Sequence, residues 1–127
     1  MDGIRALLVE DDRLCQKLAM TVLGGAGFAV DCARTGTEAL AKARAGHYDV
    51  ILLDLGLPDI HGLQVAAQLR RDAPTSRTPI IAVTAEAMRG NSADVPGCDG
   101  YIAKPIDARA FARRVADVMA AVREVGQ

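Results

Sequence analysis

Charged and hydroxyl side chains stand at four points of this sequence where a buried strand is expected to end. In chain order these residues are Glu10, Asp11 and Asp12, then Asp54, then Thr84, and finally Lys104. A strand end must meet water somewhere, so one or two polar residues there need no explanation. Chemically matched groups after the first, third, fourth and fifth aliphatic runs indicate a shared site.

The residue types at these positions predict phosphoryl chemistry. Carboxylates held close together repel and raise each other's pKa unless a cation joins them. Ligand sets made only of oxygen favour a hard cation such as Mg²⁺. A carboxylate can also act as a nucleophile and form an aspartyl phosphate. Lys104 and Thr84 would contact the remaining phosphoryl oxygens, so the set offers a metal holder, a nucleophile, a hydroxyl donor and a cation.

The elements that must position these groups alternate between strands and helices. Short aliphatic runs predict buried strands, and apolar residues at helical spacing predict the helices between them. Such alternation implies an α/β fold with a five-stranded parallel sheet and helices on both faces, and ligands bind outside the carboxyl ends of its strands. The expected strands cover residues 4–9, 28–33, 49–53, 79–83 and 100–103, and the expected helices cover 14–23, 35–45, 62–71 and 107–124.

Length and charge restrict the function classes. A chain of 127 residues, half of them hydrophobic, suits one domain over 1–127 with a core of its own. The net charge of -1, four aromatic residues and no Trp argue against direct binding of nucleic acid. No apolar run is long enough to span a membrane, and the N-terminus lacks the order of a signal peptide. Three widely spaced cysteines without a CxxC motif predict free thiols in a reducing compartment, the cytoplasm.

Four motifs together carry a family resemblance. They are LLVEDD at 7–12, DLGLPD at 54–59, VTA at 83–85 and GYIAKP at 100–105. In this order, each at a strand end, they strongly resemble the receiver domain of two-component response regulators, from residue 5 to about 125. The resemblance implies a chemotaxis-regulator-like (βα)5 fold of the flavodoxin type. Residues 98–106 are especially similar to the receivers of hybrid histidine kinases.

The resemblance assigns roles to the acidic residues. Asp54 corresponds to the phosphoacceptor, which takes a phosphoryl group from a phosphohistidine. Glu10 and Asp11 correspond to the acidic pair that holds Mg²⁺, or Mn²⁺ in its place. Asp11 and Asp54 would bind the ion directly, Glu10 would act through water, and the Gly56 carbonyl would add another oxygen.

The resemblance also assigns a switch. Thr84 would turn to bind the phosphoryl group, Tyr101 would swing inward, and Lys104 would pair with phosphoryl oxygens next to a cis bond to Pro105. The family's proteins accept phosphoryl groups in signalling, and in part catalyse their own phosphotransfer and autodephosphorylation. The implied donor is a sensor histidine kinase or a histidine phosphotransfer protein. The output is phosphorylation-dependent binding of an unidentified protein by a monomer or weak dimer, without membrane or nucleic acid.

Several of these residues also have a structural interpretation. Asp12 is expected to cap the first helix rather than bind metal. Tyr101 alone would be a half-buried aromatic on an edge strand. The arginine pairs at 70–71 and 113–114 are interpreted as solvated helix faces. His47 and His61 are expected in loops.

Three other identities compete with the receiver interpretation. A haloacid-dehalogenase-type phosphatase usually needs an acid two residues after its nucleophile, where this chain has Gly56. A flavin-binding electron carrier needs a hydroxyl- and Gly-rich phosphate cradle after the first strand, where Glu10 and Asp11 would repel phosphate. A receiver excised from a longer regulator has the same chemistry, although Met1 three residues before the first strand suits a free-standing protein.

The segment 86–99 departs from the family's pattern. Gly90 and Pro96 in this segment predict a fourth helix that is short or irregular, of at most two turns over about 87–94, or a disordered segment. Gly56, Glu86 and the small Ala85 are expected to tune the lifetime of the phosphoryl group.

Overall fold

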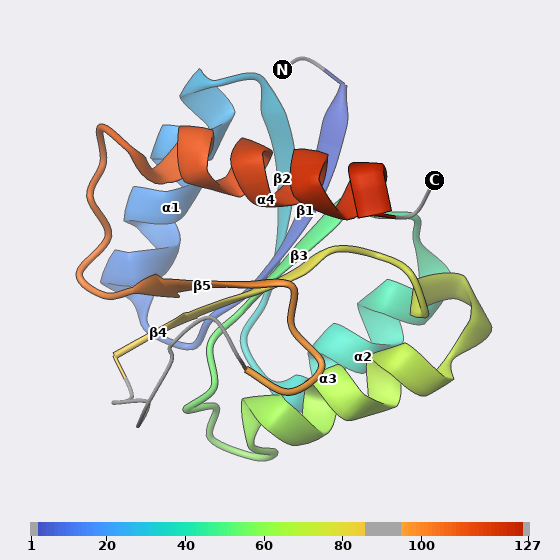
Figure 1. The fold of residues 1–127 in the computed structure, drawn as a ribbon. Coiled ribbons are helices and arrows are strands. Elements are labelled where there is room, and N and C mark those ends of the chain that lie inside the picture. The colour runs from blue at the N-terminus through green and yellow to red at the C-terminus, as the bar shows by residue number, and fades with distance from the viewer. Residues whose placement is uncertain (1–2, 86–94, 126–127) are drawn as a thin grey trace.

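A computed structural model of the chain describes residues 3–85 and 95–125, and in them a parallel five-stranded sheet has the order β2-β1-β3-β4-β5. Helices cover both faces of this sheet (Figure 1), as the alternation predicts. The strands are β1 (Ile4–Val9), β2 (Phe28–Ala33), β3 (Val50–Leu53), β4 (Ile80–Thr84) and β5 (Gly100–Ala103). The helices are α1 (Arg13–Gly25), α2 (Gly36–Ala45), α3 (Gly62–Arg71), the 3₁₀ turn η1 (Ala73–Thr75) and α4 (Phe111–Val125).

The central strands are apolar at almost every position because both of their faces are covered. All four residues of β3 and all five of β4 are buried. On one face, Leu8 and Leu52 pack with Phe111 of α4 and Leu23 of α1. On the other face the core lies under α2 and α3. Removing each of these cores from water stabilises the sheet by about 25 cal/mol per Å² of apolar surface buried.

Local capping explains where the first two helices begin. Asp12 caps α1, because its Oδ1 accepts hydrogen bonds from the amides of Leu14 (2.8 Å) and Cys15 (3.2 Å). The capping interpretation of Asp12 is thus confirmed. Thr35 caps α2 by accepting from the Glu38 amide at 3.0 Å, and the Glu38 carboxylate accepts from the amide of Arg34 at 2.7 Å.

The largest boundary difference concerns the last helix. The sequence pattern predicts its start at residue 107, but α4 begins at Phe111. The Asp107 carboxylate accepts from the Arg109 amide at 3.0 Å, and its carbonyl accepts from Ala110 and Phe111. Asp107 therefore stabilises a turn that precedes the helix. The other expected boundaries agree within about two residues. The expected helix at 87–94 and the tuning residue Glu86 lie outside the described residues.

Arg70 corrects the interpretation of the arginine pairs. Arg71, Arg113 and Arg114 are exposed as expected, but the Arg70 side chain is only 24% exposed. Its guanidinium donates to the Thr78 carbonyl at 2.6 Å and to the Gly97 carbonyl at 3.0 Å. It also pairs with Asp99 at 2.6 Å. Arg70 thus ties the loops before β4 and β5 to α3 instead of facing solvent.

Two further features complete the fold. Among the described residues, no helix is both long enough and apolar enough to cross a membrane. Cys15, Cys32 and Cys98 are free, and all three are partly buried. Burial raises the pKa of the Cys98 thiol to about 11.

Candidate functional site

The predicted site residues lie together at the carboxyl edge of the sheet. The register pairs Val9 with Leu53, so Glu10 and Asp54 leave neighbouring strands side by side. Thr84 is the last residue of β4 and pairs with Ala103 of β5, and Lys104 follows Ala103 directly in the chain. Parallel strands end at one edge, which is why residues separated by almost the whole chain share one site.

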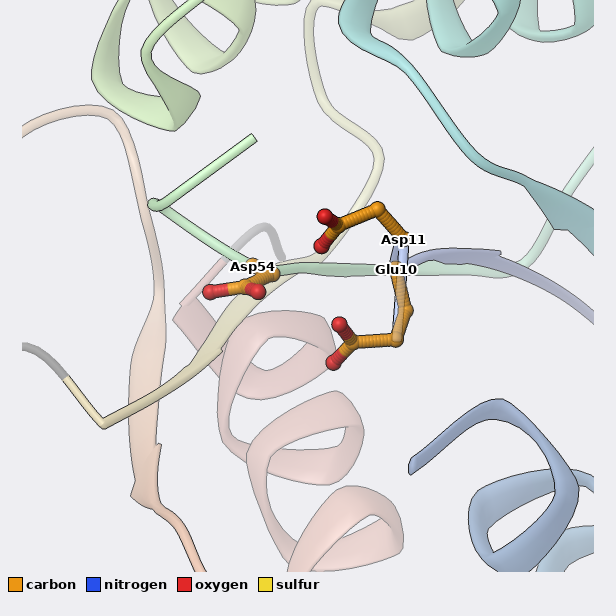
Figure 2. A group of neighbouring side chains, drawn as sticks. All are labelled: Glu10, Asp11 and Asp54. Atoms are coloured by element: carbon orange, nitrogen blue, oxygen red, sulfur yellow. The ribbon is translucent and has the colours of Figure 1, made fainter. Parts of the chain in front are cut away.

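Three carboxylates form a cluster at this edge. One oxygen each from Glu10, Asp11 and Asp54 lie within 4.8 Å of one another. Figure 2 shows Glu10 and Asp11 on adjacent positions after β1, with Asp54 beside them at the end of β3. Glu10 is 3% exposed and Asp54 is 7% exposed, whereas Asp11 is more accessible. Two buried carboxylates and one accessible carboxylate offer a cation an oxygen ligand set open on one side.

Lys104 supplies the counter-charge in the described residues. Its Nζ lies 2.6 Å from Glu10 Oε1 and 3.2 Å from Asp54 Oδ2. Burial by itself lowers the pKa of the ammonium, but the Glu10 hydrogen bond and the charge of Asp54 outweigh it and raise that pKa. Lys104 is therefore a fixed cation at neutral pH. Burial raises the pKa of Glu10, and this effect exceeds the opposing effect of the Lys104 hydrogen bond.

Backbone amides engage the second oxygen of each buried carboxylate. The Asp12 amide donates to Glu10 Oε2 at 3.1 Å, and the Gly56 amide donates to Asp54 Oδ1 at 3.2 Å. Each carboxylate thus has Lys104 on one oxygen and a peptide N–H on the other. This arrangement holds Asp54 in one orientation and keeps its charge partly neutralised.

Thr84 and Tyr101 lie on the two strands next to the acidic cluster. Thr84 is 1% exposed, and its carbonyl accepts from the Lys104 amide at 3.1 Å. Tyr101 pairs with Ala82 in the β4–β5 ladder and packs, partly buried, against the small cluster that includes Leu55. The Lys104–Pro105 peptide bond is cis, as expected. Tyr101 is thus a half-buried aromatic on an edge strand here, and its role as a switch stays a prediction.

Two residues that support the site escaped the sequence reasoning. The Gln16 side chain on α1 donates to the Glu10 carbonyl, which fixes the exit of β1. Asp59, which the sequence patterns mark only as the last residue of the motif at 54–59, binds the start of α2 with both carboxylate oxygens. An acid beside Pro58 in the loop after Asp54 was a weak signal, because its helix partners lie 22 and 23 residues away.

The polar residues of the four motifs lie together at one edge of the sheet. The sequence matches the family model of the response regulator receiver domain over residues 6–116. This chain belongs to the response regulator receiver family. The Brucella ovis polar-differentiation response regulator DivK is 40% identical to this receiver over 107 residues, which are 83% of this chain and 87% of DivK.

Solved receiver structures agree with the fold. The receiver domain of a Pseudomonas aeruginosa sensor histidine kinase, solved with a magnesium ion coordinated in its active-site cleft, has a TM-score of 0.84. It is 31% identical, and the match covers 93% of this chain and 98% of that one. The response regulator TrrA of Thermotoga maritima, solved in complex with Mg²⁺-BeF, has a TM-score of 0.79 at 30% identity, with 91% and 98% covered.

Proposed function

We propose that this receiver accepts a phosphoryl group on Asp54 from a phosphohistidine and signals by binding another protein in its phosphorylated form. The observation that carries the proposal is the buried Asp54 carboxylate, held 3.2 Å from Lys104 beside Glu10 and Asp11. Membership of the receiver family supports the same chemistry. Residues 1–127 are proposed to act as a single domain.

The transfer step follows from the chemistry of a carboxylate nucleophile. An Asp54 oxygen attacks the phosphorus of the phosphohistidine, a P–O bond forms and the P–N bond breaks. The imidazole leaves with the electron pair of that bond and takes up a proton. Lys104 stabilises the negative charge on the phosphoryl oxygens, and the Gly56 amide keeps Asp54 oriented. Autodephosphorylation is hydrolysis of the acyl phosphate. Water attacks phosphorus, the bond to Asp54 breaks and inorganic phosphate leaves.

The acidic cluster fits a divalent cation. Its donors are all oxygen atoms, as Mg²⁺ prefers, and Mn²⁺ accepts the same ligands. Asp11 and Asp54 would hold the ion directly, Glu10 would act through water, and the Gly56 carbonyl would add another oxygen. A divalent ion, when bound, neutralises charge on the transferring phosphoryl group.

The switch residues respond to the new charge at Asp54. Thr84, at the end of β4, donates a hydrogen bond from its hydroxyl to a phosphoryl oxygen, and Tyr101 on the adjacent strand turns toward the space that the threonine leaves. Both residues change the surface near β4 and β5, where a partner protein reads the phosphorylated state. This receiver is thus a signalling phosphoacceptor rather than an enzyme acting on a separate substrate.

The partners are proteins of the same signalling class. The donor is a sensor histidine kinase or a histidine phosphotransfer protein, and the receiver works as a monomer or weak dimer. Helix α1 begins at the edge of the site and exposes Leu14 (81%) and Leu18 (39%), one turn apart. These side chains offer a donor protein an apolar contact beside Asp54. Free cysteines fit a cytoplasmic location.

Intact mass after incubation with acetyl phosphate tests the proposal. Wild type with Mg²⁺ is expected to gain one phosphoryl group, and removal of the metal with EDTA prevents the gain. Asp54→Asn is expected to gain none, while Asp117→Asn, which changes an exposed acid on α4, behaves as wild type. An adduct of equal yield in Asp54→Asn would contradict the assignment of Asp54.

A further inference from the structure

The loop between β3 and α3 is attached to the first turn of α2 through Asp59. Asp59 Oδ1 accepts from the Gly36 amide at 2.8 Å, and Oδ2 accepts from the Thr37 amide at 3.0 Å and the Thr37 hydroxyl at 2.7 Å. Oδ1 also accepts from the Ile60 amide at 2.8 Å. One exposed carboxylate thus satisfies two amides that the start of a helix leaves without intrahelical partners.

Gly36 shows that the loop and the helix are fitted closely to each other. A Cβ at Gly36 would lie 2.9 Å from Val65 Cγ2 and 3.1 Å from Ile60 Cβ. A larger residue would push both the loop at Ile60 and α3 at Val65 away from α2, so this close approach favours glycine. The Asp59 attachment is therefore a packed junction and not only a set of surface hydrogen bonds.

The same loop is closed at its base next to the phosphoacceptor. The Gly62 amide donates to the Leu55 carbonyl at 2.8 Å. A Cβ at Gly62 would lie 2.6 Å from the Asp54 carbonyl oxygen and 2.5 Å from Leu55 Cα. The loop thus leaves Asp54 and returns to it, with Asp59 as its anchor on the neighbouring helix.

Gly56 lies inside this closed loop, three residues before Asp59. Its amide donates to Asp54 Oδ1, and the proposed function assigns its carbonyl to the metal. Both contacts need the peptide at Gly56 to be held at a fixed distance from Asp54. Asp59 fixes the far side of the loop to α2, which limits how far the Gly56 backbone can move from Asp54.

We propose that Asp59 is a positioning residue for metal binding and phosphoryl transfer, which holds the Gly56 peptide by anchoring its loop to α2. This inference rests on the proposed function. The Thr37 hydroxyl and the Gly36 and Thr37 amides hold the pKa of Asp59 well below its usual range, so the anchor stays ionised at neutral pH. Because binding linkage is reciprocal, metal bound at the site also stabilises the first turn of α2.

Two variants of the anchor give a graded test. Asp59→Ala removes all four hydrogen bonds, and Thr37→Val removes only the one from the hydroxyl. Asp72→Asn is the matched control, because Asp72 also binds α2, through Arg44 at 2.9 Å, but lies at the end of α3. Mg²⁺ affinity is measured by calorimetry, and the initial rate of phosphorylation is measured by intact mass with acetyl phosphate. Thermal unfolding identifies any variant that fails to fold.

Asp59→Ala is expected to weaken Mg²⁺ binding roughly tenfold or more, as residues that orient ligands generally do. Thr37→Val should weaken it less, and Asp72→Asn should leave it unchanged. In wild type, Mg²⁺ is expected to slow hydrogen exchange of the Gly36 and Thr37 amides.

Folded Asp59→Ala that binds Mg²⁺ within twofold of wild type would overturn the inference. If Asp59→Ala does not fold, an affinity of Thr37→Val equal to wild type would overturn it. Wild type that binds no Mg²⁺ would contradict the metal site of the proposed function, and this inference with it.

Discussion

Lys104 Nζ lies 2.6 Å from Glu10 Oε1, and these two side chains are 14% and 4% exposed. The ammonium reaches Asp54 as well, so one lysine neutralises two buried carboxylates. A divalent cation would be attracted by the same oxygens. We therefore expect Lys104 to stabilise the receiver without metal and to compete with a bound metal for Glu10 and Asp54.

Replacing Lys104 with Met should therefore separate its effect on stability without metal from its competition with the metal. Without metal, the free energy of unfolding should fall by about 3 kcal/mol, because two buried carboxylates lose their cation. Mg²⁺ should restore more stability to Lys104→Met than it adds to wild type, since the ion meets no competitor. Urea denaturation with and without Mg²⁺ measures both. An equal gain from Mg²⁺ in the two proteins would refute the competition.

Asp12 should affect stability without affecting phosphorylation. Asp12→Ala removes the cap of α1 and should cost about 1 kcal/mol of unfolding free energy. Asp12→Asn, which keeps a capping oxygen, should cost much less. Acetyl phosphate should label both variants to the wild-type extent. A loss of Mg²⁺ affinity in Asp12→Asn would show instead that this acid binds the metal.

Leu14 should matter only when the phosphoryl donor is a protein. Leu14→Glu places a charge where we expect an apolar contact, and transfer from a phosphorylated histidine phosphotransfer protein should slow about tenfold, the equivalent of about 1.4 kcal/mol. Acetyl phosphate makes no such contact and should label the variant at the wild-type rate. Equal slowing with both donors would place the effect at the site itself.

Asp59 should contribute a pH-dependent part of the stability. Its pKa is lowered in the folded chain, so its contribution is complete above the ordinary Asp value of about 3.9 and is lost as pH falls through the lower folded pKa. Asp59→Asn should lose less stability than wild type between pH 4 and 2. Thermal unfolding across this range measures the difference, and parallel curves for the two proteins would contradict it.

The strands and the acidic cluster were predictable because both depend on short-range patterns. Unbroken apolar runs predict the strands, and the polar residue after each run predicts Glu10, Asp54 and Lys104 at one edge. The attachments of Arg70 to Asp99 and of Asp59 to Thr37 were not predictable, because these partners lie 29 and 22 residues apart and hydrophobic periodicity says nothing about them. The switch at Thr84 and Tyr101 is a change between two states, and it stays a prediction.

The most direct test of the account is to locate the phosphoryl group in the chain. Borohydride reduces an aspartyl phosphate to homoserine, and tandem mass spectrometry of the digested protein then identifies the modified position. Receiver treated with acetyl phosphate and Mg²⁺ should contain homoserine at position 54, and the untreated protein should contain none. Homoserine at position 11 or 12, or a phosphoryl adduct on a residue that is not an aspartate, would contradict the assignment of Asp54 as the phosphoacceptor.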